Sequence, residues 1–262
     1  MENNTAQAPV KKDRSRLYGL IIRIAAIAVI VISVFYGVLT FLSHGAEDGR
    51  NAYRMNWMRE LTAGGGLYSD TVPMGSLEAI QAAIDFGNYN VKLDVKLADE
   101  TLVLDYENSY PLRDALELTL RNNCGVILEI KEGGAKTAQA ICALLEEMKY
   151  DNGHLAIQSE DTKAIEWLKD NRPLVIRGLV TGELKETDLN GFEKFLHRNM
   201  LLNYTCRPFY VVFDADYLPT LASDSIRKQI YVLSGKTSDI KDIEALNESV
   251  DGFILEGYTF AE

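Results

Sequence analysis

The sequence predicts an α/β fold, a (β/α)8 TIM barrel preceded by one N-terminal transmembrane helix. Nine strand patterns alternate with helix patterns beyond residue 57, and two of these strands are joined by a very short loop. If these two form a hairpin, eight strands remain in about 200 residues, most of them followed by a helix, which is typical of this barrel. A run of 19 uncharged residues, Ile24–Leu42, precedes the strands. A doubly wound sheet is the alternative, although it usually has fewer strands.

The N-terminal apolar run is long enough to cross a membrane. At about 1.5 Å per residue, a helix over Ile24–Leu42 spans a hydrocarbon core of about 30 Å. The apolar pattern continues on the other side of Arg23, from residue 17 to residue 22, so we expect a transmembrane helix over residues 17–43. A cleaved signal peptide with residues 43–46 as its cleavage site is the alternative, but the run exceeds the apolar region of a typical signal peptide.

Charged residues on the two sides of this run predict its orientation in the cell membrane. Residues 1–16 hold four basic side chains, whereas Glu47 and Asp48 follow the run. The positive-inside rule therefore predicts a cytoplasmic tail over residues 1–16. It places a short polar linker over residues 44–56 and the barrel over residues 57–262 outside the membrane.

Composition disfavours two classes of protein. The formal net charge is −11, and an acidic surface repels nucleic-acid phosphates, so we exclude nucleic acid as a partner. The three cysteines, Cys124, Cys142 and Cys206, are odd in number and lack metal-ligand spacing, so no disulfide framework is indicated. We expect Cys124 and Cys142 to be small buried apolar residues.

Apolar stretches bounded by turn residues predict the strands. We expect them at residues 59–62, 90–95, 102–105, 125–130, 155–158, 174–180, 209–214, 229–234 and 252–255. Apolar residues at a spacing of three or four predict the helices, with Ser76 as an N-cap, Gly87 as a stop and Pro111 as a start. The main helices are expected over residues 76–87, 111–120, 137–149, 188–198 and 238–247, with shorter ones around residue 165 and after Pro219.

Only four residues, 98–101, join the second and third strand patterns. So short a connection cannot make a parallel crossover, and we therefore expect an antiparallel hairpin. Asp94 stands near the end of its first arm. Functional side chains of such a barrel lie at the C-terminal ends of its strands, so this hairpin marks the expected site.

Three carboxylates stand at strand ends. Asp94, Glu129 and Asp214 come from three different strands, and carboxylates in this arrangement could hold Mg²⁺ or Ca²⁺. Lys131 could face an anionic substrate. From spacing alone, the competing interpretation is that the carboxylates cap loops and that the lysine balances their charge.

Five stretches of the chain carry a resemblance to a known family. They read LTAGGGLYSDTVPMGSLEAIQAAIDFG (61–87), VKLDVKL (91–97), LVLDYEN (102–108), VILEIK (126–131) and VVFDADYLP (211–219). In order and spacing they resemble the glycerophosphodiester phosphodiesterases, a branch of the phosphatidylinositol-phospholipase-C-like barrels. The second stretch is similar to the family's ELDV strand, the third to the arm that normally ends in a His-Asp pair, and the fourth to its strand ending in Glu-x-Lys. The resemblance covers residues 60–256 and implies a TIM barrel.

The resemblance also implies a site. In that family, carboxylates of the ELDV and Glu-x-Lys strands hold a divalent cation, and two histidines act as general acid and base. Here the two histidine positions fall on Thr62 and on Tyr106, or on Asp105 if the gap moves by one residue. The first glutamate of ELDV falls on Lys92, and the asparagine of the helix-start motif falls on Gly75.

Of the family's site, only Asp94, Glu129 and Lys131 are retained. A threonine hydroxyl cannot exchange a proton near pH 7, and a tyrosine with a pKa of about 10 is a poor base. Lys92 would place its ammonium group where the family holds its cation, and it would neutralise Asp94 and Glu129 there.

These replacements predict a membrane-anchored, catalytically inactive relative of the phosphodiesterases, without a cofactor. Its barrel would bind a partner protein or a phosphate-bearing ligand outside the membrane, the ligand through Lys92 and Lys131. The first alternative is an active phosphodiester hydrolase of lipid metabolism, with Tyr106 and Asp105 as altered acid and base. It would hold Mg²⁺ or Ca²⁺ on the three strand-end carboxylates. The second alternative is a purely structural domain.

Overall fold

The computed structural model describes residues 14–45, 49–87, 90–181, 189–215, 218, 231–237, 245, 248 and 250–256. The chain divides into two compact units, Met1–Thr40 and Phe41–Glu262. Most of helix α1 (Arg14–Ser43) belongs to the first unit, and the strands and the other helices belong to the second.

Helix α1 is long and apolar enough to cross a membrane. Its stretch Tyr18–Ser43 has 26 residues and a mean hydropathy of 2.6. Most side chains of this stretch are exposed, whereas Ser43 at its end is buried. The helix begins at Arg14, so the last residues of the expected tail 1–16 are helical, and residues 1–13 lie outside the described part of the chain.

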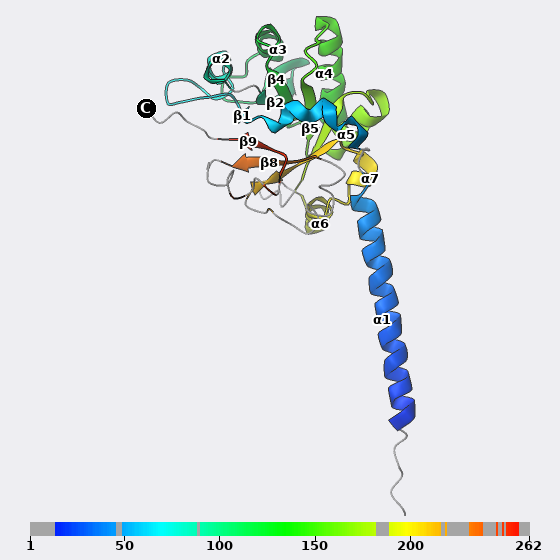
Figure 1. The fold of residues 1–262 in the computed structure, drawn as a ribbon. Helices are drawn as coiled ribbons and strands as arrows, with labels where there is room; N and C mark the ends of the chain where they lie inside the picture. Colours follow the sequence, from blue (N-terminus) through cyan, green and yellow to red (C-terminus); the bar gives the residue numbers. More distant parts are fainter. Residues whose placement is uncertain are drawn as a thin grey trace, which may run out of the picture. The chain divides into compact units, whose positions relative to one another are not determined.

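Eight parallel strands form a barrel (Figure 1). They are β1 (Thr62–Gly64), β2 (Asn90–Ala98), β4 (Gly125–Ile130), β5 (Leu155–Ser159), β6 (Ile176–Val180), β7 (Tyr210–Asp214), β8 (Tyr231–Thr237) and β9 (Gly252–Leu255). Each strand pairs with the next in this series, and β1 pairs with both β2 and β9, so the ring closes. The predicted α/β barrel is confirmed.

The predicted hairpin is also confirmed, with a shorter turn than expected. Strand β3 (Thr101–Leu104) pairs antiparallel with the far half of β2, from Val95 to Ala98. Only Asp99 and Glu100 connect the two arms, at φ values of 44° and 68°. Positive φ at both central residues is the geometry of a two-residue hairpin turn that follows the twist of the strands. The hairpin therefore extends β2 beyond the ring.

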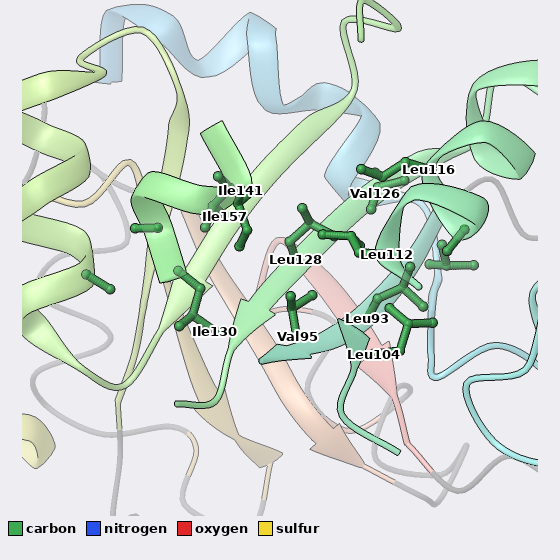
Figure 2. Packing of buried hydrophobic residues seen from close by; sticks show 14 of the residues in the cluster. Leu93, Val95, Leu104, Leu112, Leu116, Val126, Leu128, Ile130, Ile141 and Ile157 are labelled. Atoms are coloured by element: carbon green, nitrogen blue, oxygen red, sulfur yellow. The ribbon is translucent and has the colours of Figure 1, made fainter. Parts of the chain in front are cut away.

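Helices cover the outer face of the first strands. They are α2 (Leu77–Phe86), α3 (Leu112–Arg121), α4 (Gly134–Met148) and α5 (Thr162–Asn171) (Figure 1). The side chain of Ser76 accepts a hydrogen bond from the N–H of Ala79, and Gly87 ends α2 in the left-handed region, as expected. Figure 2 shows the apolar layer between the strands and these helices, with Leu93, Val95, Leu104, Leu112, Leu116, Val126, Leu128, Ile130, Ile141 and Ile157 labelled.

Several boundaries differ from those expected. Strand β1 begins at Thr62, where the expected strand ended, and α4 begins three residues early, at Gly134. Helix α6 (Gly191–Arg198) begins after a capping box on Asn190, and the four-residue helix α7 (Asn203–Cys206) was not expected. The helix expected after Pro219 and most of the one expected over 238–247 lie outside the described residues.

The second half of the segment expected to be a linker, residues 44–56, packs together with the barrel. Residues Gly49–Arg59 form a 3-10 helix, η1. The side chains of Met55 and Met58 are 2% and 1% exposed and pack in the core inside the ring of strands. The backbone carbonyl of Trp57 accepts a hydrogen bond at 2.8 Å from Asn90, the first residue of β2. This segment therefore closes the N-terminal end of the barrel.

Candidate functional site

Polar side chains line the barrel interior toward the C-terminal ends of the strands. Successive side chains of a strand point to opposite faces. In β2, Val91 and Leu93 pack in the layer under the helices, so Lys92 and Asp94 point into the barrel. The register pairs Asp94 with Glu129 of β4, which brings two predicted site residues side by side.

The ammonium group of Lys92 lies among three carboxylates. Its Nζ is 2.8 Å from Oδ1 of Asp94, 3.6 Å from Oε2 of Glu129 and 2.6 Å from Oε1 of Glu256. The Lys92 side chain is 2% exposed, so these carboxylates rather than water balance its charge. Glu256 directly follows β9, and Gly64 leaves room for it, because a Cβ at position 64 would lie 2.7 Å from Cγ of Glu256.

Glu129 extends this network across the barrel. Its Oε1 accepts a hydrogen bond from Nζ of Lys131 at 2.9 Å, and its Oε2 accepts one from Nε2 of Gln158 at 2.7 Å. Oε1 of Gln158 in turn accepts a hydrogen bond from the Tyr210 hydroxyl at 3.0 Å. Side chains from β4, β5 and β7 are thus joined in one buried chain of hydrogen bonds.

The charges of Lys92, Glu129 and Lys131 keep one another ionised. Burial alone lowers the pKa of Lys92, but attraction by the three carboxylates raises it well above its ordinary value. Burial raises the pKa of Glu129, but the two ammonium groups of Lys92 and Lys131 bring it down to about 2. Burial outweighs Lys92 at Asp94, whose pKa is raised. With two ammonium groups and three carboxylates, the cluster carries a formal net charge of −1.

Thr62 and Tyr106 stand at the two positions where the resemblance places the family's histidines. Thr62 is 1% exposed and lies on β1, two residues before the position that pairs with Lys92. The Tyr106 hydroxyl oxygen accepts a hydrogen bond at 3.0 Å from the backbone N–H of Asp94. Burial, followed by the Asp94 charge, raises the pKa of Tyr106 above its ordinary value of 10.0, so its proton is held even more firmly than in water.

The histidines of the chain lie elsewhere. His154 stacks on Trp57 with ring centroids 5.7 Å apart, at the N-terminal end of the barrel. His197 is buried in α6, and His44 directly follows α1. Asp105, the alternative position for the second histidine, pairs with Lys96 at 2.6 Å on the hairpin. None of these groups faces the carboxylates of Asp94 and Glu129 within the described part of the chain.

A divalent cation does not fit among these carboxylates while Lys92 is present. Mg²⁺ and Ca²⁺ bind oxygen at about 2.0–2.6 Å, so an ion shared by Asp94, Glu129 and Glu256 would lie where Nζ of Lys92 already lies. At 3 Å from the ammonium group, its repulsion is on the order of 10 kcal/mol for an effective dielectric constant of about 20. With Lys92 in this position, no group of three or more His, Cys, Asp and Glu side chains among the described residues is arranged to hold a metal.

Sequence reasoning missed three members of the cluster. Glu256, rather than the expected Asp214, supplies the third carboxylate at Lys92, and Asp214 ends β7 with Gly235 as its strand partner. Gln158 and Tyr210 were also not singled out. A signal existed for two of them, because Gln158 and Glu256 each stand at the C-terminal end of a predicted strand, where barrel sites lie.

Comparison with known proteins places this barrel beside phosphodiesterases. No family model and no curated protein matches the chain. A glycerophosphodiester phosphodiesterase from Parabacteroides distasonis matches with a TM-score of 0.60 and 16% identity, over 76% of this chain and 92% of that one. A phosphodiesterase from Oleispira antarctica, solved with its product sn-glycerol-3-phosphate, matches with a TM-score of 0.60 and 16% identity, over 77% and 94%.

A third match is the glycerophosphodiester phosphodiesterase from Thermotoga maritima, with a TM-score of 0.53 and 21% identity over 74% of this chain and 93% of that one. At such identities the likeness concerns the fold. The chain has the TIM-like barrel of the glycerophosphodiester phosphodiesterases, in agreement with the resemblance of its motifs.

Proposed function

We propose that this chain is a membrane-anchored barrel of the glycerophosphodiester phosphodiesterase type that does not hydrolyse phosphodiesters. In this proposal α1 crosses the membrane once, with the N-terminus in the cytoplasm, and the barrel binds a partner protein on the outer side. The supporting observation is the set of side chains at the barrel mouth, where Thr62, Tyr106 and Lys92 stand at positions that need two proton-transfer groups and a metal ligand.

Loss of proton transfer supports the inactive reading quantitatively. A positioned general acid or base typically contributes about 10²- to 10⁴-fold to the rate. Two such groups are missing, and the buried Tyr106 cannot serve as a base near pH 7 because its pKa is raised. An active hydrolase that uses Tyr106 and Asp105 instead is the alternative, but the carboxylate of Asp105 is paired with Lys96.

The charges of the site disfavour a phosphate-bearing ligand. Lys92 and Lys131 are the ammonium groups that a phosphate would need, and both are already paired with carboxylates. A phosphate entering a cluster with a formal net charge of −1 would have to displace a carboxylate from each lysine.

A hydrolysis assay tests the proposal. The full chain in detergent micelles is incubated with glycerophosphocholine and with a chromogenic phosphodiester, each with Mg²⁺, Ca²⁺ or Mn²⁺. We expect no turnover above that of the Glu129→Gln variant. Turnover by the unaltered chain that this variant lacks would reject the inactive reading and support the alternative hydrolase.

A ligand titration separates the two binding hypotheses. A ligand that binds only the folded state raises the melting temperature. We expect sn-glycerol-3-phosphate at millimolar concentration to leave the melting temperature unchanged, because Lys92 and Lys131 are already paired with carboxylates. A saturable rise that disappears in Lys131→Met would show that the mouth binds phosphate-bearing ligands and would replace the protein partner in this proposal.

A further inference from the structure

Lys92 has the position and the surroundings of a bound cation. Its Nζ is reached by carboxylates from three separate parts of the ring: Asp94 on β2, Glu129 on β4 and Glu256 after β9. Oxygen atoms gathered from distant segments around one positive centre are the usual environment of Mg²⁺ or Ca²⁺. Here the positive centre is a side chain of the protein, so it cannot be removed by dilution or by a chelator.

The charges that remain without Lys92 would suit a dication. The ammonium group of Lys131 balances the charge of Glu129. It donates a hydrogen bond to Oε1 of Glu129, the oxygen that does not face Lys92. Removing the ammonium group of Lys92 would therefore leave two uncompensated negative charges around a buried space. A divalent ion would balance them.

We propose that Asp94, Glu129 and Glu256 form a latent divalent-cation site and that the ammonium group of Lys92 permanently fills it. While Lys92 is present, the site cannot bind another cation. The folded barrel is consequently independent of external calcium or magnesium. Replacing Lys92 with an uncharged side chain opens the site to Ca²⁺ or Mg²⁺. This inference is independent of the proposed function, because it concerns which cation fills the cluster and not whether the barrel hydrolyses or binds a partner.

Thermal unfolding of three full chains in detergent micelles tests this proposal, each in EDTA and in 10 mM CaCl₂ or MgCl₂. The unaltered chain should melt at the same temperature in all three buffers. Lys92→Met should melt far lower in EDTA, and 10 mM cation should raise its melting temperature by about 5–10 °C if the dissociation constant is about 0.1 mM. Lys96→Met is the matched control, since Lys96 lies on the same strand but pairs with Asp105 away from the cluster. It should show no cation dependence.

A second variant and a direct binding measurement complete the test. Lys92→Glu adds a carboxylate to the cluster, so it should depend on the cation more strongly than Lys92→Met. Terbium luminescence should detect binding to both variants and not to the unaltered chain. The proposal would be overturned by a cation-dependent melting temperature or terbium binding in the unaltered chain at this cluster. Equal melting of the Lys92→Met chain in EDTA and in both cations would overturn it as well, whether that chain is folded or unfolded.

Discussion

The aromatic ring of Tyr106 lies directly against Gly75, in the space that a side chain at position 75 would occupy. Gly75 has a φ of +71°, and its N–H donates to the carbonyl oxygen of Gly65 at 2.8 Å. The Tyr106 hydroxyl meanwhile accepts the N–H of Asp94. The two departures from the family pattern at these positions therefore have one physical explanation, because the larger side chain at 106 requires the absence of a side chain at 75.

The Gly75→Asn substitution should destabilise the barrel through this contact. Overpacking typically costs about 1–3 kcal/mol, and the Tyr106 ring cannot move without losing its hydrogen bond to Asp94. Gly153→Asn is the control, since its φ of +70° is nearly the same but a Cβ there meets nothing within 4 Å. Asn tolerates the left-handed region better than most residues, so the control should cost less than about 1 kcal/mol. Denaturant unfolding of both variants measures the difference.

The same measurement in a Tyr106→Ala background identifies the cause. If the ring opposes Asn at position 75, the penalty for Gly75→Asn should fall to that of Gly153→Asn once the ring is removed. An unchanged penalty in that background would mean that the cost comes from the backbone of the glycine loop.

Acid should weaken the barrel through Glu129. Its pKa in the folded state is about 2, below its ordinary 4.5, so the ionised carboxylate contributes stability above pH 4.5 that is lost as the pH falls toward 2. The difference corresponds to about 3 kcal/mol, and the raised pKa of Asp94 offsets part of it. The free energy of unfolding should therefore fall less steeply with acid in Glu129→Gln. Parallel curves for the two proteins between pH 7 and pH 3 would contradict this role.

Glu256 should matter more than an exposed glutamate in an ion pair. Its carboxylate is 26% exposed and lies 2.6 Å from the buried ammonium group of Lys92, so Glu256→Gln should cost about 1.5–3 kcal/mol. Glu100→Gln is the control, because Glu100 is 86% exposed and its ion pair with the exposed Lys136 is longer, at 3.4 Å. It should have almost no effect. Equal effects of the two substitutions on the free energy of unfolding would show that the Lys92–Glu256 ion pair contributes no more stability than an exposed one.

The order of the elements was readable in the sequence because it depends on local patterns. Strands β4 and β9 have the predicted bounds, and the hairpin followed from a connection too short for any parallel arrangement. Its turn was placed over four residues instead of two, because Asp99 and Glu100 adopt positive φ without the usual Asn-Gly signature. Local patterns therefore gave the ring of strands, but not every turn within it.

The missing parts depend on contacts between distant segments. Nothing near Glu256 in the sequence shows that it reaches Lys92 across β1, since that contact requires ring closure and the absence of a side chain at Gly64. The segment η1 looked like a linker because it is polar overall, although Met55 and Met58 lie in the core inside the ring of strands. The position of Lys92 among Asp94 and Glu129 was predictable, because alternation along β2 and pairing with β4 fix it.

Labelling of intact cells should reveal which side of the membrane holds the barrel. Cys124, Cys142 and Cys206 are buried and free, and burial raises their pKa values to about 12, 11 and 12, so they should resist a thiol reagent. A membrane-impermeant maleimide should therefore label Glu100→Cys, which lies on the exposed hairpin turn. It should not label Asn4→Cys until the membrane is permeabilised. The reverse result would invert the proposed orientation, and loss of an N-terminal tag would indicate a cleaved signal peptide.

The methionines of η1 should behave as core residues of the barrel. Met58 is 1% exposed inside the ring of strands, so Met58→Ala should lower the free energy of unfolding by about 2–5 kcal/mol. Leu174→Ala removes a side chain that is 78% exposed and should change it by less than about 0.5 kcal/mol. If η1 were only a tether, the two substitutions would have equal and small effects.

Since η1 closes the N-terminal end of the barrel, a soluble fragment that begins at residue 57 should be less stable than one that begins at residue 45. The shorter fragment lacks Met55 and the first turns of η1.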